Sequence, residues 1–114
     1  MRESDVAMTE LETAFLRAIA AANPSLQPLV RTAKVVKREF TGAGSFTEFD
    51  SGSAPELGDR SFDLGPLIIN IPGQERGMGA ELTCRGGKLH RLEVFTLGVH
   101  SWDGDATGFS ITAA

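Results

Sequence analysis

The feature that most constrains this fold is a hairpin pattern in the last third of the chain. Residues 78–85 alternate with a period of two, and Gly86-Gly87 separates them from a second strand-like run, 88–97. One side of the first run carries its apolar residues, Met78, Ala80, Leu82 and Cys84. The other side carries Gly79, Glu81, Thr83 and Arg85. Such alternation is typical of a strand that buries one face. The chain must therefore contain an antiparallel sheet with one covered side.

The register of this hairpin follows from the pairings that keep apolar side chains together. A two-residue loop would mix apolar and charged partners, pairing Leu82 with Arg91 and Ala80 with Glu93. A three-residue loop, Gly86-Gly87-Lys88, instead pairs Cys84 with His90, Leu82 with Leu92 and Ala80 with Val94. Because a slip of one residue turns a whole strand to the wrong face, we predict the three-residue loop. Glu81 and Glu93 then lie opposite one another on the polar side.

Residues 5–22 predict one amphipathic helix ahead of the strands. Its apolar residues recur every three or four positions and form one stripe, made of Met8, Leu11, Phe15, Ala18, Ile19 and Ala22. The other side holds Glu10, Glu12, Thr13 and Arg17. Ser4 or Asp5 can cap the start, and Thr9 with Glu12 has the spacing of a capping box. Asn23-Pro24 ends the helix, because proline disfavours helical geometry in the residue before it.

The rest of the chain predicts further strands, at residues 30–41, 46–50, 62–71 and 108–112, with a polar loop at 51–60. Pro66 requires a bulge in the third of these, or a start at Leu67. A length of 114 residues fits one domain. We therefore expect a single α+β domain over residues 1–114, with the N-terminal helix packed on a curved antiparallel sheet of five or six strands.

Charge and composition exclude several classes of function. A formal net charge of −4 does not favour nucleic-acid binding, and the local basic cluster (Arg31, Lys34, Lys37 and Arg38) is expected to be the solvated face of a strand. No segment approaches the ~20 apolar residues of a membrane span, and the acidic N-terminal residues lack the apolar core of a secretory signal. We therefore expect a cytoplasmic protein, a monomer or small homo-oligomer, that binds neither nucleic acid nor membrane.

Two groups of residues suggest reactive sites but have simpler explanations. Cys84 beside His90 has the composition of a cysteine nucleophile, yet both would lie on the apolar face, where they pack as core residues. Residues 103–108 match the first half of a calcium loop, but its twelfth position falls on Ala114 and not on a glutamate. An Asp- and Gly-rich turn explains the same residues. We predict no catalytic residue, no metal site and no cofactor.

A resemblance adds to these patterns. The stretch 41–49 is a glycine-flanked aromatic strand, and the later stretch reads Leu89-x-x-Leu92-Glu93-x-Phe95-Thr96-x-Gly98-x-x-x-Trp102. Together they resemble a loose group of small uncharacterised bacterial proteins, over about half of the chain. This chain departs from the group at Val94 and Ser45, where a small residue and an aromatic are expected. The resemblance implies no established activity, but some bacterial proteins of this size and style are immunity or accessory factors.

These observations favour a small non-enzymatic binding or protein-interaction protein of accessory or immunity type. Its candidate binding residues are Glu81 and Glu93, whose like charges oppose each other unless a cation intervenes, and Trp102, which we expect to be partly exposed at a rim. Arg85 and Arg91 could supply that cation as an exposed network. The alternative is a small ligand-binding or enzymatic cup, with an apolar pocket between helix and sheet. A pocket with two or more titratable groups favours the cup, and a flat acidic face favours the interaction protein.

Overall fold

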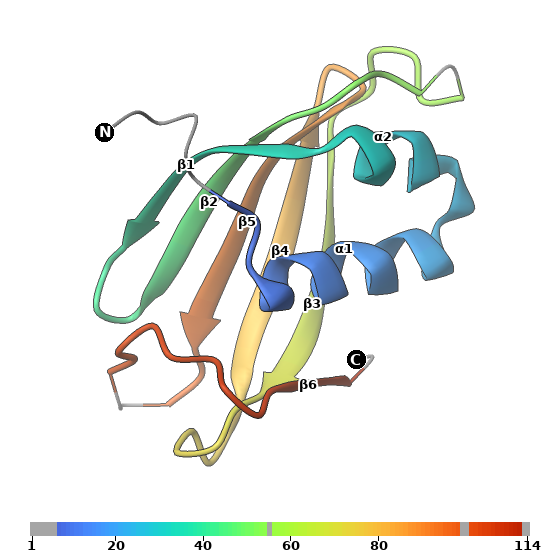
Figure 1. Cartoon of the computed structure of the whole chain (residues 1–114). Helices are drawn as coiled ribbons and strands as arrows, with labels where there is room; N and C mark the ends of the chain where they lie inside the picture. Colours follow the sequence, from blue (N-terminus) through green and yellow to red (C-terminus); the bar gives the residue numbers. More distant parts are fainter. Residues whose placement is uncertain (1–6, 55, 99–100, 113–114) are drawn as a thin grey trace.

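The computed structural model describes residues 7–54, 56–98 and 101–112. Helix α1 (Glu10–Ala22) is followed by a short 3₁₀ helix, η2 (Pro24–Leu26), and by helix α2 (Gln27–Thr32). The strands are β1 (Lys34–Phe40), β2 (Gly44–Asp50), β3 (Phe62–Asn70), β4 (Met78–Arg85), β5 (Lys88–Thr96) and β6 (Ser110–Thr112). All six strands form one open antiparallel sheet in the order β1-β2-β5-β4-β3-β6 (Figure 1). The predicted α+β class is confirmed.

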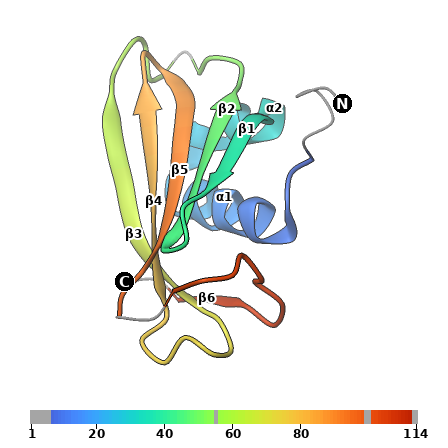
Figure 2. The ribbon, with the colours of Figure 1, turned by 90° about the vertical axis from the view of Figure 1, so that its left-hand side faces the viewer.

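The helices lie on one side of the sheet, as Figure 2 shows edge-on. Leu11, Phe15 and Ile19 are buried, as the helical stripe predicts, and Leu16 joins them. They share the core with apolar side chains of the central strands, Met78, Ala80, Leu82, Leu92 and Val94. Burial of both sets removes apolar surface from water, which is the main force that holds the two layers together.

The boundaries of the helices differ from the predicted ones. Residues 7–9 are not helical, and α1 begins at Glu10 behind the Thr9 cap; the alternative caps Ser4 and Asp5 lie outside the described residues. Residues 30–32, predicted as the start of a strand, belong to α2. Its Pro28 stands in the first turn, where the missing N–H would have no helical partner in any case. None of the described helices has the length and apolar character needed to cross a membrane.

The central hairpin confirms part of the predicted register and corrects the rest. Leu82 lies opposite Leu92, and Ala80 lies opposite Val94, as predicted. The loop, however, consists of Gly86 and Gly87 alone, with φ angles of +61° and +76°. Positive φ at both positions is the geometry of a tight type I′ turn, which glycine adopts without strain.

A bulge in β5 reconciles this short loop with the apolar pairing. Cys84 lies opposite Leu89, so the predicted pairing of Cys84 with His90 is wrong. His90 is the extra residue that shifts the register between Thr83 and Cys84. A second irregularity lies between Leu64 and Leu67 of β3, and it confirms the bulge expected at Pro66.

Candidate functional site

The sheet has a second face that no described helix covers (Figure 2). We call it the open face. Side chains alternate along a strand, and Arg38 and Thr47 reach helix α1, so their neighbours in sequence point the other way. Following the strand pairings, the open face carries Lys34, Lys37, Glu39, Phe46, Glu48, Asp50, Asp63, Ile68, Glu81, Thr83, Arg85, Lys88, Arg91, Glu93 and Phe95. Six carboxylates and five basic groups are spread over this face, and two of the carboxylates, Glu81 and Glu93, meet near its centre.

Glu81 and Glu93 lie directly opposite one another near the centre of the open face, as the sequence predicts. Both are half-buried. Among the described residues, no Lys or Arg nitrogen lies within 4.0 Å of either carboxylate. Arg91 instead stacks its guanidinium over the ring of Phe46, 5.0 Å from the centroid. The neutralising network expected from Arg85 and Arg91 is therefore absent from the described part of the chain.

Apolar side chains lie next to this acidic pair. Phe46 is opposite Glu93, and Phe95 is opposite Gly79, which in turn is opposite Ile68. The ring of Phe95 lies over Gly79 so closely that a Cβ there would be 2.5 Å from it. Phe46, Phe95 and Ile68 are each half-buried. The open face thus combines uncompensated carboxylates with partly accessible apolar surface.

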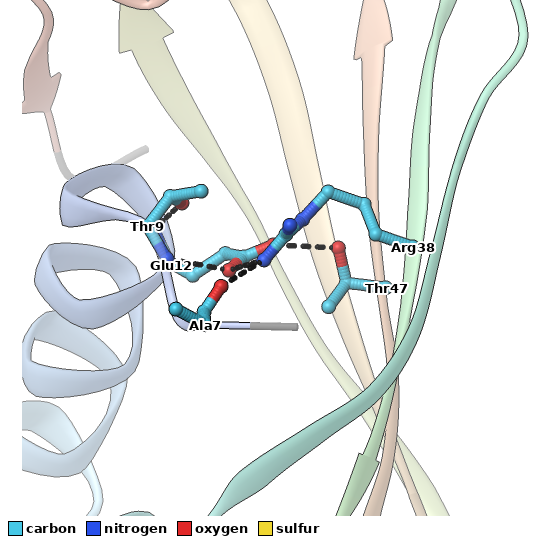
Figure 3. Close-up of polar contacts among 5 residues, drawn as sticks. All are labelled: Ala7, Thr9, Glu12, Arg38 and Thr47. Atoms are coloured by element: carbon cyan, nitrogen blue, oxygen red, sulfur yellow. Dashed lines mark hydrogen bonds and ion pairs between the residues drawn. The ribbon is translucent and has the colours of Figure 1, made fainter. Parts of the chain in front are cut away.

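The helix-covered face holds a buried carboxylate, Glu12, that the helical pattern places on the polar side of α1. Its Oε1 accepts hydrogen bonds from the Thr9 N–H (2.8 Å) and from Nη2 of Arg38 (2.6 Å) (Figure 3). Its Oε2 accepts from Nε of Arg38 (2.8 Å) and from the Thr47 hydroxyl (2.7 Å). Burial alone would raise the pKa of Glu12, but these hydrogen bonds and the charge of Arg38 outweigh it and lower that pKa.

The hydrogen bonds of Glu12 link α1 to Arg38 of β1 and to Thr47 of β2. Both oxygens of Glu12 already accept two hydrogen bonds each, so the carboxylate has no lone pair left to take a proton from a substrate. Its lowered pKa likewise makes it a poor general base. Glu12 and Arg38 therefore hold the structure together and shape the space beside them.

A cavity of about 390 Å³ lies beside this network. The start of α1, the strands β1, β2 and β5 and the segment 102–109 enclose it. Trp102 is one wall: it is only 8% exposed, and its indole N–H donates to the carbonyl of Asp105 (3.1 Å). The expected partial exposure of Trp102 is therefore wrong, because the segment folds back and packs its ring on the core. The ring of Phe40 lies beside it, with centroids 6.1 Å apart.

The two reactive groups suggested by the sequence are not assembled. Burial, together with the nearby charge of Asp63, raises the pKa of Cys84 to about 11, so its thiol stays protonated at neutral pH. His90 is displaced from Cys84 by the bulge. In the segment 103–108, the carboxylates of Asp103 and Asp105 accept hydrogen bonds from residues two positions further on.

The two bonds donated by the N–H groups of Asp105 and Thr107 are the side-chain-to-backbone bonds of ordinary turns, and the third is donated by the Thr107 hydroxyl. The hydrogen bonds from Thr107 also lower the pKa of Asp105. The described residues contain no group of three or more His, Cys, Asp or Glu side chains placed to hold a metal ion, and Ala114 lies outside them.

Only part of the network around Glu12 is visible in the sequence. The spacing of Thr9 and Glu12 predicts the capping box, which the structure confirms. Nothing local indicates that Arg38 turns inward, because an irregularity between Val35 and Lys37 shifts the alternation of β1. Comparison of the chain with protein-family models, with curated proteins and with solved structures found no match. The candidate sites are therefore identified from the geometry of this chain and not from a relative.

Proposed function

We propose that this chain is a non-enzymatic interaction protein that binds a basic segment of a partner protein on its open face. The observation that supports this most directly is the pair Glu81 and Glu93, which face each other with no Lys or Arg nitrogen of the described residues within 4.0 Å. Like charges placed opposite on a sheet cost stability. A Lys or Arg side chain of a partner would relieve that repulsion and gain two acceptors at once.

The surroundings of the pair support a protein partner over a simple inorganic cation. Phe46, Phe95 and Ile68 offer half-buried apolar surface beside the carboxylates. Interfaces typically combine such an apolar centre with charged groups that set orientation and specificity. The most suitable partner segment therefore alternates basic and apolar residues, as an extended strand does.

The paired carboxylates at the centre of the open face favour a basic partner over a second copy of this chain. Glu81 and Glu93 lie together near the centre of the open face, and the same pair of a second copy placed against them would repel them. The saturated carboxylate of Glu12 and the protonated thiol of Cys84 support a role without chemistry. An accessory or immunity protein that captures a basic partner fits this surface.

A titration tests the proposal. An isotope-labelled sample is titrated with a peptide of alternating Lys and Leu, and with a matched peptide of alternating Glu and Leu, while backbone NMR shifts are followed. We expect only the Lys peptide to shift residues of β4, β5 and β2. Glu81→Gln and Glu93→Gln should weaken binding, and the loss should shrink as salt screens the charges. The control Glu75→Gln makes the same change in net charge at an exposed turn residue.

Two results would contradict the proposal. One is equal loss of affinity in Glu81→Gln and Glu75→Gln, which would mean that the peptide responds to net charge alone. The other is a set of shifts confined to α1 and α2, which would place binding on the covered side.

A further inference from the structure

The cavity beside Trp102 lies on the helix-covered side of the sheet and shares no residue with the open face. Leu11, Val94 and Phe109 supply apolar walls, and Phe40 and Trp102 form an aromatic corner. Its volume of about 390 Å³ lies within the range of small-molecule sites in proteins. Phe40 is 57% exposed, and its ring lies beside that of Trp102.

A buried hydroxyl opens into this cavity. Ser45 is only 6% exposed, and its Oγ has no hydrogen-bond partner among the described residues. No fully enclosed side-chain N or O atom of those residues is left without a partner, and Ser45 lines the cavity, so we infer that its Oγ is reached from the cavity. Ser45 lies opposite both Phe40 and Val94, which line the same space. An accessible hydroxyl without a protein partner can hydrogen-bond to a ligand or to water.

A second donor lies beside it. The guanidinium of Arg38 uses Nε and Nη2 to bind Glu12 and the carbonyl of Ala7, but Nη1 has no acceptor among the described residues. Arg38 lines the cavity and lies opposite Thr47, two positions along β2 from Ser45. The inner wall of the cavity therefore offers hydrogen-bond donors, which suit an oxygen acceptor such as a carbonyl.

Charge restricts the ligand further. The positive charge of Arg38 is already matched by the bidentate carboxylate of Glu12. Glu10 and Asp105 also line the cavity and are exposed, so they add negative charge where it meets solvent. An anion would be repelled at this opening, and a cation would meet donors inside. We propose that the cavity binds a small uncharged organic molecule with an apolar body and a carbonyl oxygen that accepts from Ser45 Oγ and Arg38 Nη1.

Three ligands of matched shape test this class. Phenylpropanamide is uncharged and carries a carbonyl, phenylpropanoate is its anionic counterpart, and phenylpropylamine is its cationic one. Trp102 is the sole tryptophan, so its fluorescence reports on the cavity directly. We expect saturable binding of the amide, with the two charged compounds at least about tenfold weaker, a difference of about 1.4 kcal/mol.

The variant Ser45→Ala removes the hydroxyl that has no protein partner, so the fold should keep its stability. It should weaken binding of the amide by about two- to tenfold, the effect of one hydrogen bond. Ser53→Ala, an exposed serine in the loop after β2, is the matched control and should bind as the parent does. Glu81→Gln should leave the affinity for the amide unchanged, which keeps this inference separate from the proposed function of the open face.

Tighter binding of the carboxylate or of the amine would overturn the uncharged class, because a charge would then dominate recognition. Failure of all three compounds to change Trp102 fluorescence at their solubility limits would overturn the site itself. An unchanged amide affinity in Ser45→Ala would also refute the proposed contact.

Discussion

Replacing Glu12 with Gln should destabilise this protein by about 2–4 kcal/mol, although the change alters few atoms. The carboxylate accepts four hydrogen bonds, two at each oxygen. A glutamine keeps one acceptor oxygen, and its NH₂ group would face donors at the other position. Whichever oxygen is replaced, one N–H of Arg38 loses its acceptor, and so does either the Thr9 N–H or the Thr47 hydroxyl.

The magnitude follows from the burial of those donors. Breaking a buried ion pair by removing one partner costs about 3–5 kcal/mol. The Arg38 side chain retains 16% exposure, so water can reach part of it, and the cost should fall below the top of that range. The expected loss is nevertheless a large share of the 5–15 kcal/mol by which a typical domain is stable, about one third.

Urea denaturation measures the effect, and Glu10→Gln is the matched control. Glu10 stands two residues before Glu12 in the same first helical turn, but it is exposed and its substitution should change stability by no more than about 0.5 kcal/mol. A double-mutant cycle with Arg38→Met should return a coupling energy of about 1–3 kcal/mol. Equal denaturation midpoints for Glu12→Gln and Glu10→Gln would refute the reasoning.

The same network predicts a dependence on pH. The pKa of Glu12 is lowered below its ordinary value of 4.5 in the folded protein. A carboxyl with a depressed folded pKa contributes stability that is present above the unfolded pKa and is lost as the pH falls through the folded one. The stability difference between the parent and Glu12→Gln should therefore be full at neutral pH and shrink below about pH 4.5. A difference that stays constant through this range would show that ionisation is irrelevant.

Three further predictions follow from the same structure. Phe15 is fully buried, so Phe15→Ala should cost about 3–5 kcal/mol in urea denaturation, and an unchanged midpoint would mean that the helix stripe does not face the sheet. Glu81→Gln or Glu93→Gln should leave the free energy of unfolding unchanged or raise it by a few tenths of a kcal/mol, and any gain should be smaller at high salt. A clear loss of stability would show that a cation already pairs with the carboxylate. Cys84 is buried with a pKa raised to about 11, so the native protein at neutral pH should resist a thiol reagent until it is unfolded, and rapid labelling would contradict its burial.

The hairpin shows that the sequence predicts which residues pair but not where the extra residue lies. Alternation along β4 predicts that Glu81 faces Glu93, and the structure confirms it, because exchanging the faces would expose the whole apolar set. The same argument assigned the extra residue to the loop. The chain instead places it at His90 in a bulge, since two glycines with positive φ form the tighter turn. Both arrangements restore the same apolar pairing, so periodicity alone cannot distinguish them.

The amino-acid pattern predicts the α+β class, the burial of Phe15 and the pair of glutamates, because each depends on a periodicity within one element or one hairpin. The burial and the partners of Glu12, Arg38 and Trp102 depend instead on contacts between elements that are distant in sequence. A charged side chain is buried only if a partner satisfies it, and here that partner is 26 residues away in sequence. The strand irregularity that aims Arg38 inward, and the segment that folds Trp102 over the cavity, depend on contacts between distant elements. The residues next to Arg38 and Trp102 in the sequence do not predict those contacts.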